Sequence, residues 1–420
     1  MKALFSRNRL IALGGSLAVI LLAPLLSSKG FWLSLLCQIG ISTVFALSFN
    51  MLLGQTGLLS FGHAVYFGLG AFATIHLLRA INEHSWRFPV TLLPLAGGAA
   101  GLLFGLALGY VTTRRAGTTF AMISLGVGEM VAASSLMFPA LFGGEGGLSG
   151  NRVTGAGWFG VTYGSPLQMY YLIAGWAFLC VVGMYVLTDT PLGRMANAVR
   201  DNPERAEFVG FDPQWVRYLM VVLAGCFAGV AGGLTALNYE IVTAETLSAA
   251  TSGIVIMMAF VGGIGHFAGP IVGAALITVL QIAIAGITQA WPFYFGILFT
   301  VLVLNAPGGI AGIVAEHKRL YEAGQLGGAL HRYLLGLLPF ALCAAGVVTL
   351  VEMAYALANT TEPGSAPVRV FGITLNAARP LGWAPPVVAL LVGALALRAL
   401  SRWTAARQRT LYTSLLQRQA

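Results

Sequence analysis

Residues 218–237 read YLMVVLAGCFAGVAGGLTAL, an apolar run that carries no charge and is interrupted by four glycines. A helix needs about twenty such residues to cross a bilayer, and small residues let neighbouring transmembrane helices approach closely. A strand of a membrane β-barrel would be about half as long and would alternate apolar and polar residues. The stretch therefore predicts a membrane-spanning helix packed against other helices.

The composition extends this prediction to the whole chain, which is 57% hydrophobic and only 9% charged. A soluble domain carries roughly 25% charged residues, so most of this surface is expected to face lipid. Within lipid the backbone groups must be paired internally. The predicted fold class is all-α, a polytopic transmembrane helix bundle. The four cysteines lie in apolar runs and are interpreted as buried hydrophobes, with no metal site.

Twelve apolar spans are predicted along the chain, and the eighth and tenth are short enough to be partial or tilted. They are Leu10–Leu26, Phe31–Leu53, Leu58–Leu78, Pro89–Val111, Thr118–Phe142, Leu167–Leu187, Tyr218–Leu237, Leu247–Val261, Ala268–Ile287, Trp291–Leu304, Tyr333–Leu357 and Ala384–Leu400.

The distribution of basic residues predicts the orientation. When the spans alternate from a cytoplasmic N-terminus, seventeen of the 23 Lys and Arg residues fall in cytoplasmic segments, as the positive-inside rule expects. Both termini are then cytoplasmic. The first span is interpreted as an uncleaved helix, because its apolar stretch exceeds that of a usual signal peptide. The basic residues are spread over loops, which does not favour a nucleic-acid surface.

One cytoplasmic segment, residues 190–213, has the sequence of two short capped helices. Thr190 followed by proline is typical of a helix start, and Asp201 or Asn202 followed by proline predicts a second one. Gly210 is suited to the end of that second helix. Either these are amphipathic helices on the lipid surface, or they form a rigid lever that docks into a soluble partner.

The same segment resembles the coupling loop of the branched-chain amino-acid ABC permease family (the LivM-like subunit). That family has the pattern G-R-x-x-x-A-x-R-x-N-x-x-x-A-E-x-x-G. The matching residues are Gly193, Arg194, Ala198, Arg200, Asn202, Ala206, Glu207 and Gly210. Residues 46–64, 123–129 and 261–270 resemble three further motifs of the family, in order, so the likeness covers about residues 35–315. His266 departs from the pattern, because the family usually has a small hydroxyl residue there.

The resemblance implies a permease domain over residues 1–315, in which the coupling loop 190–213 contacts an ATPase through Gly193, Arg194, Arg200, Ala206, Glu207 and Gly210. It also implies a bacterial inner-membrane location and these partners: two ABC ATPase subunits that bind the ATP, a related second permease in a heterodimer, and a periplasmic solute-binding protein. No cofactor is expected on this chain. The solute would be a branched-chain amino acid, urea, a short amide or an aromatic acid. Residues 316–420, with two further spans, form an extension without an assigned role.

Candidate pathway residues surround a glycine-interrupted region, Gly54–Gly70, since broken helices expose backbone groups at transporter sites. Neutral polar side chains that suit a zwitterion gather there: Asn50, Gln55, Thr56, Ser60 and His63. The alternative is that they bond neighbouring helices. Glu129, a carboxylate inside a span, either lines the pathway or has a structural role, as a helix cap or a partner of Arg114 or Arg115.

The main alternative function is an ion-coupled secondary transporter of small polar solutes. Such proteins use intramembrane carboxylates or histidines, and only Glu129 and Glu352 are acidic residues well inside predicted spans. The chain contains no H-E-x-x-H, no G-x-S-x-G and no P-loop, which argues against an enzyme and places ATP hydrolysis on another polypeptide.

Overall fold

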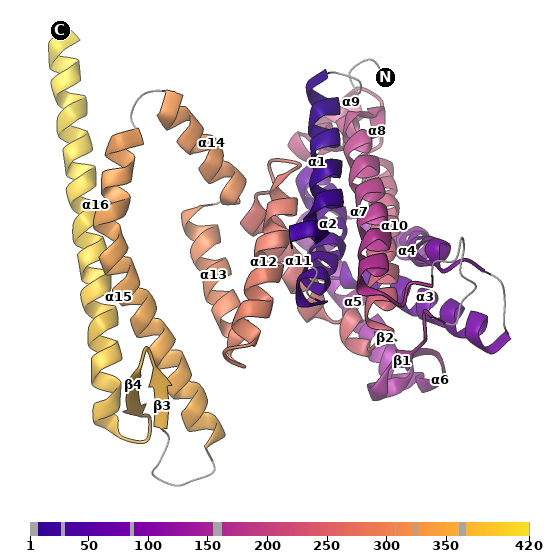
Figure 1. Ribbon diagram of the computed structural model, residues 1–420. Coiled ribbons are helices and arrows are strands. Elements are labelled where there is room, and N and C mark those ends of the chain that lie inside the picture. The colour runs from indigo at the N-terminus through magenta and orange to yellow at the C-terminus, as the bar shows by residue number, and fades with distance from the viewer. Residues whose placement is uncertain are drawn as a thin grey trace. The chain divides into compact units, whose positions relative to one another are not determined.

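The computed structural model describes residues 7–26, 30–84, 88–153, 162–306, 308–322, 326–360 and 367–419. The chain divides into two compact units (Figure 1). The first comprises Met1–Ile284 and Ile297–Ile313, and the second comprises Ala285–Gly296 and Val314–Ala420.

The first unit is a helix bundle. Its helices are α1 (Arg7–Leu26), α2 (Gly30–Thr56), α3 (Ala64–His84), η1 (Val90–Leu92), α4 (Leu93–Thr112), α5 (Thr118–Met137), α6 (Pro139–Phe142), η2 (Gly144–Gly146), α7 (Pro166–Asp189), α8 (Pro191–Asp201), α9 (Pro203–Phe208), α10 (Pro213–Tyr239), η3 (Ala244–Leu247), α11 (Ala249–Gly262) and α12 (Gly269–Ala285). The strands β1 (Leu148–Ser149) and β2 (Ile241–Val242) pair antiparallel. The helices α13 (Trp291–Asn305) and α14 (Gly309–Glu322) each contribute residues to both units.

The all-α polytopic prediction is confirmed. Within the described ranges, eight helices are long and apolar enough to cross a membrane, and the number rises to nine when α13 and α14 count as one broken span. Helices α11 and α12, with 14 and 17 residues, are shorter than a full span. Each of the twelve predicted spans corresponds to a helix, although several boundaries differ.

The start of the predicted span Leu58–Leu78 differs from the structure, because residues 57–63 are not helical and α3 begins only at Ala64. Gly57 adopts a left-handed φ of +70° and its N–H donates to the Leu53 carbonyl, an arrangement that ends a helix. Hydropathy does not detect such a stop, so the prediction of a helix from residue 58 was wrong.

Helix α10 lies at the centre of the first unit and packs against α2, α3 and α4. Its contact with α4 is made by glycines at a spacing of four residues, Gly97 and Gly101 on α4 facing Gly225 and Gly229 on α10. A Cβ atom on Gly229 would overlap the carbonyl oxygen of Gly97. Small residues at this spacing let two transmembrane backbones touch, so the glycines in the opening stretch build the core.

The second unit is an antiparallel pair of helices, α15 (Leu326–Asn359) and α16 (Ala384–Gln419), which lie side by side in Figure 1. The strands β3 (Pro367–Val370) and β4 (Ile373–Asn376) form a hairpin, and η4 (Pro380–Trp383) follows it. A small core of Met353, Val368 and Ala377 joins the hairpin to the helices. Within this unit the Tyr294 hydroxyl donates to Glu352 at 2.8 Å, which gives this intramembrane carboxylate a partner.

Replacing Gly229 by alanine is expected to destabilise the protein by about 1–3 kcal/mol, the usual cost of overpacking. The matched control is Gly175→Ala in α7, where an added Cβ meets nothing within 4 Å. That control should be neutral or stabilising, because alanine is the better helix former by about 1 kcal/mol. Thermal unfolding of both variants in detergent measures the difference, and equal midpoints would contradict the packing argument.

Candidate functional site

A buried histidine lies at the break between α2 and α3. His63 is fully buried, and its Nε2 lies 2.9 Å from the Ser48 hydroxyl of α2. Its ring stacks on Phe45 with centroids 5.5 Å apart, while Nδ1 has no hydrogen-bond partner within the described residues. The break therefore places one unpaired ring nitrogen inside the bundle.

The other predicted pathway residues of α2 and the break are buried beside it. Asn50 Oδ1 and Gln55 Oε1 also lack partners in the described part of the chain. Thr56 donates to the Leu52 carbonyl of its own helix at 2.5 Å, and Ser60 lines a very small enclosed cavity. An unpaired buried acceptor costs about 1–3 kcal/mol. We call these five buried residues of α2 and the break the polar cluster; Asn50, Gln55 and His63 each keep a buried polar atom without a partner in the described structure.

A larger cavity of about 240 Å³ lies next to this cluster. Its lining residues are Gln38, Ile41, Ser42, Phe45, Phe67, Thr235, Thr243, Glu245, Thr246, Thr251, Ile254, Met258 and Gln281. The rings of Phe45 and Phe67 lie 4.4 Å apart, and Phe45 also contacts His63. A phenylalanine layer therefore separates the cavity from the buried cluster. We call this cavity the polar vestibule.

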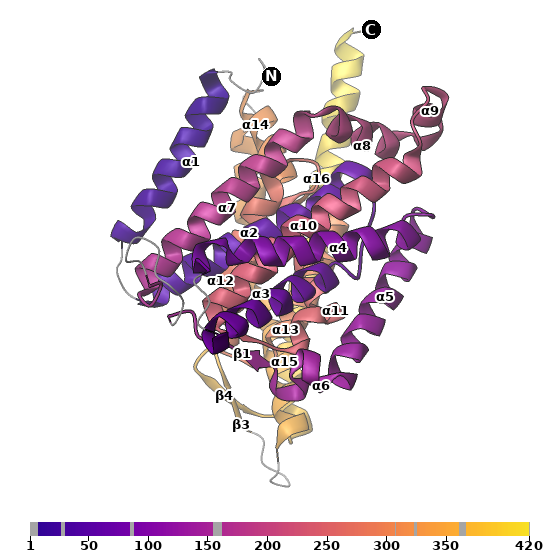
Figure 2. The same ribbon diagram turned by 90° about the vertical axis from the view of Figure 1, so that its right-hand side faces the viewer.

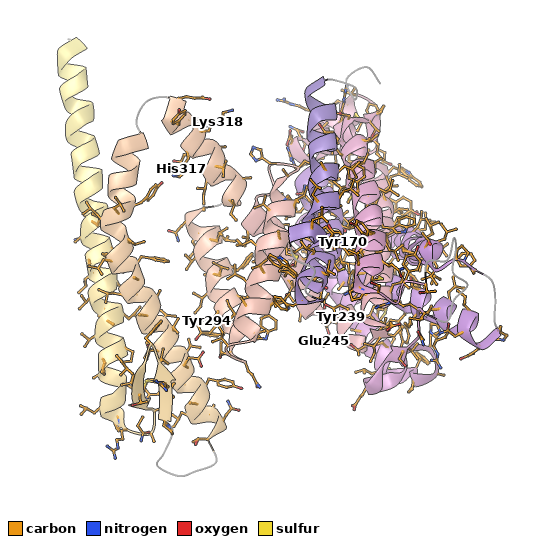
Figure 3. All side chains as sticks on the ribbon, viewed as in Figure 1. Tyr170, Tyr239, Glu245, Tyr294, His317 and Lys318 are labelled. Carbon is orange, nitrogen blue, oxygen red and sulfur yellow. The ribbon has the colours of Figure 1, made fainter. Side chains whose placement is uncertain are left out.

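The polar vestibule was missed at the sequence level, because its residues come from α2, α3, α10, η3, α11 and α12 and share no motif. Only α2 offers a local signal, since Gln38, Ser42 and Phe45 recur at helical spacing. Glu245 and Tyr239 lie at the end of the first unit that also carries β2 (Figure 3). The vestibule and helices α8 and α9 are at opposite ends of α10, as Figure 1 shows for β2 and α9 and Figure 2 for β1, the partner of β2, and α9.

The predicted capped helices of residues 190–213 are confirmed as α8 and α9. The Thr190 hydroxyl accepts from the Gly193 N–H at 3.2 Å, and Asn202, rather than Asp201, caps α9 by accepting from the Arg205 N–H at 2.9 Å. Gly210 has a φ of +92°, and its N–H donates to Glu207 O at 2.8 Å. This left-handed glycine closes α9, so both short helices of the loop have defined ends.

The predicted coupling residues differ in exposure. Gly193 and Ala206 are buried, whereas Arg194, Glu207 and Gly210 are exposed. Beside them lie two apolar side chains that the sequence analysis did not single out: Phe208 is 91% exposed and Val209 is 74% exposed. Phe208 and Val209 therefore form an exposed apolar surface at the tip of this loop.

The side chain of Arg200 makes hydrogen bonds within this chain. Its guanidinium donates to the Gly54 carbonyl at the end of α2 and to Asp201 at 2.9 Å. Gly54 lies between Asn50 and Gln55 on the same helix end. One side chain therefore ties α8 to the part of α2 that carries the polar cluster.

One predicted pathway residue, Glu129, does not join the cluster. Glu129 is exposed on α5, next to the exposed Gly126 and Met130, and its carboxylate has no partner among the described residues. Arg114, one suggested partner, lies instead over the Tyr110 ring at 5.0 Å. His266, which departs from the family pattern, is exposed in the turn between α11 and α12.

Comparison with known proteins identifies the family of this chain. The sequence model of the family "Branched-chain amino acid transport system / permease component" matches residues 31–307. The chain belongs to this family. It is therefore a multi-pass membrane permease, and the predicted resemblance is confirmed.

Three relatives support the assignment. The high-affinity branched-chain amino acid transport system permease protein LivM of Salmonella typhimurium is 27% identical over 309 residues, covering 68% of this chain and 71% of LivM. The Escherichia coli LivM is 25% identical over 305 residues with the same coverage. A probable branched-chain amino acid transport permease protein LivH of Methanocaldococcus jannaschii is 31% identical over 152 residues, covering 32% of this chain and 45% of LivH. No solved structure matches.

Replacing Arg200 by alanine is expected to loosen α8 from α2. A hydrogen bond that involves a charged group contributes about 1.5–3 kcal/mol, and each 1.4 kcal/mol is a factor of ten. Amide hydrogen exchange in α8 should therefore become about tenfold faster. The control is Arg194→Ala, since Arg194 is exposed on the same helix. Equal exchange in both variants would contradict the tie between α8 and α2.

Proposed function

We propose that the chain is the transmembrane permease subunit of an ATP-driven ABC importer for small amino-acid-like solutes, with branched-chain amino acids as the first candidates. The observation that carries this proposal is the capped α8–α9 loop, which exposes an apolar tip and is joined to the polar cluster through Arg200. A segment that only connects two membrane helices needs neither helix caps nor exposed apolar side chains at its tip.

The ATPase contact is assigned to the loop tip. Phe208 and Val209 are largely exposed, and exposed apolar groups that neighbour one another mark protein-binding surfaces. The chain has no P-loop, so ATP binds to two separate ATPase subunits and this chain carries no cofactor. Glu207 and Arg194 are exposed beside the tip and supply charges at the rim of the contact.

Closure of the ATPases pushes α9 and α8, and Arg200 transmits the displacement to the end of α2. The solute then passes the break near Asn50, Gln55 and His63, whose unpaired polar atoms supply hydrogen bonds along the way. Neutral groups bind a zwitterion without holding it as an opposite charge would. Thr56 and Ser60 complete the polar lining of this passage.

The positive-inside distribution supports a cytoplasmic location for α8, α9 and both termini. The β1–β2 pair and the polar vestibule then lie on the periplasmic side of a bacterial inner membrane, where a solute-binding protein delivers the solute. Because α10 separates the two ends, the vestibule and the coupling loop lie on opposite sides of the bilayer.

A related second permease is assigned to the exposed face of α5. Glu129 lies within a membrane span and has no partner in the described structure. A carboxylate at this depth that faced hydrocarbon would cost about 2.5 kcal/mol or more. Gly126 on the same face allows a second backbone to approach. The carboxylate therefore faces the second subunit, or the pathway between the two subunits.

Phe208→Ser is expected to weaken ATPase binding by about 2 kcal/mol, or about thirtyfold, because the apolar tip would lose its contact. ATP-driven leucine uptake by the reconstituted complex should fall accordingly. The control is Phe371→Ser, since Phe371 is 70% exposed in the β3–β4 turn. Unchanged ATPase binding and uptake in Phe208→Ser would contradict the docking assignment.

Glu129→Lys is expected to reduce co-purification of the second permease at least about tenfold, since a cation would replace a carboxylate that needs donors across the interface. The matched control is Glu145→Lys in the exposed η2 segment, which should leave co-purification intact. Recovery of the second permease with both variants would place the interface elsewhere.

The function as a whole is tested with vesicles that contain the permeases, the ATPases and the binding protein. Leucine should accumulate only with ATP and the binding protein. Accumulation driven by an ion gradient through this chain alone would instead establish a secondary transporter.

A further inference from the structure

The second unit carries an open apolar groove of about 680 Å³, formed by the start of α13, by α15 and by η4. We propose that this groove binds one acyl chain of a phospholipid from the leaflet opposite the cytoplasm, and that exposed arginines of the β3–β4 segment hold the phosphate of its headgroup. We call it the acyl groove. It is independent of the solute that the permease carries.

Two hydrogen bonds hold the chain around the start of α13 to α15. The Tyr294 hydroxyl donates to Glu352 Oε1 at 2.8 Å, and the Tyr355 hydroxyl donates to Gln289 Oε1 at 3.0 Å. Ala354 lines the groove on the same helix and is exposed. The two walls are therefore tied together, while the small side chain of Ala354 leaves space between them.

The groove lies in membrane-spanning segments. Residues Tyr333–Asn359 and Pro380–Leu400 are each long and apolar enough to cross a bilayer, and they contribute Ala354 and Trp383 to the groove. Every residue that lines it in the described structure has an apolar or aromatic side chain. Such a recess offers water no hydrogen-bond partners, whereas a lipid tail is as apolar as leucine. An acyl chain is therefore the occupant that the lining favours.

The volume of the groove matches one acyl chain. About 680 Å³ equals the volume of roughly twenty water molecules in the liquid, and a methylene group is similar in size to a water molecule. A chain of about sixteen to eighteen carbons therefore fills the groove, and the second chain of the same lipid remains in the bilayer.

The β3–β4 hairpin lies beside the groove (Figure 1). Val368 of β3 and Met353 of α15 belong to one buried core, and Met353 precedes the groove residue Ala354. Trp383 packs against this core and also lines the groove, and its indole N–H donates to the Ala377 carbonyl at 2.9 Å. A tryptophan with an apolar body and a bonded polar tip is typical of the membrane–water interface. The headgroup region therefore begins at this hairpin.

The arginines of this unit give the orientation and the headgroup contact. Five arginines lie in α16 from residue 398 onward, whereas residues 360–383 contain two, Arg369 and Arg379. The positive-inside rule then places the hairpin opposite the cytoplasm. Both of these arginines are exposed, and a guanidinium binds phosphate through paired hydrogen bonds. The hairpin therefore supplies the charge that a phospholipid headgroup needs.

Ordinary contact with the surrounding lipid is the competing interpretation. Such contact spreads over every exposed apolar side chain of α15, for example Leu338, which is 71% exposed. A binding site instead concentrates one lipid at the groove, saturates at a low lipid fraction and distinguishes between headgroups. The two interpretations therefore differ in where a lipid is cross-linked and in how cross-linking depends on its concentration.

The test uses the full-length chain in phosphatidylcholine vesicles with a small fraction of phosphatidylglycerol that carries a diazirine in one acyl chain. Irradiation and mass spectrometry locate the cross-links. They are expected at Phe293 and on α15 around Ala354. Cross-linking at Phe293 should saturate as the fraction of photolipid rises, whereas cross-linking at Leu338 should rise in proportion to it.

Ala354→Trp is expected to fill the groove. Because several methylene groups of the lipid would lose their burial, cross-linking at Phe293 should fall at least about tenfold. The matched control is Ala341→Trp, since Ala341 is an exposed alanine of the same helix. That control should leave the cross-linking at Phe293 unchanged.

The headgroup contact is tested by comparing phosphatidylglycerol with phosphatidylcholine that carries the same diazirine chain. Each arginine near an anionic headgroup contributes roughly fivefold in affinity. The combined variant Arg369→Gln and Arg379→Gln should remove the preference for phosphatidylglycerol without moving the cross-links. The control Arg115→Gln, on an exposed turn of the first unit, should keep the preference.

Two outcomes overturn the acyl groove: cross-linking that rises in proportion at both Phe293 and Leu338, or cross-linking at Phe293 that is the same in Ala354→Trp and in the unaltered chain. The first uses the unaltered chain, so it decides the matter even where Ala354→Trp does not fold. Equal cross-linking of the two lipids by the unaltered chain overturns the arginine contact. None of these measurements involves transport, so their failure leaves the importer function untouched.

Discussion

The hydrogen bond from the Arg200 guanidinium to the Gly54 carbonyl connects the two parts of this permease that have to act together. A helix end leaves its last carbonyls unpaired, and α2 ends beside the break, so Gly54 is available to an outside donor. Arginine reaches it from α8 with a charged guanidinium, and a charged donor makes a stronger hydrogen bond than a neutral one. The exposed loop and the buried polar cluster are thus joined by a charged hydrogen bond at the place where α8 packs on α2.

The sequence predicts most of the helices because the length and apolarity of a span are local properties. It also predicts the caps of α8 and α9, since Thr190 and Gly210 act on neighbours within their own segment. The start of α3 escaped prediction because a left-handed glycine interrupts an apolar run without changing its hydropathy. The helix ends are therefore the least predictable part of this fold.

The candidate site could likewise be predicted from the sequence only in part. Asn50, Gln55 and His63 could be identified because they gather within one glycine-interrupted stretch. The polar vestibule could not, because Gln38, Thr235 and Glu245 are each unremarkable in their own segments and meet only through packing. Arg200 lies in the loop that the sequence predicts to contact an ATPase, but the direction of its side chain follows from tertiary structure alone.

The short helix α11 has a consequence for the membrane around this protein. Its 14 residues span about 21 Å at 1.5 Å per residue, well below the roughly 30 Å of hydrocarbon. The turn after it, with the exposed His266, would then lie within the depth of the bilayer. Irregular backbone cannot face lipid tails there. Where the bilayer has its usual thickness, protein or water rather than lipid tails has to surround such a turn, so a change in membrane thickness would change what the turn contacts.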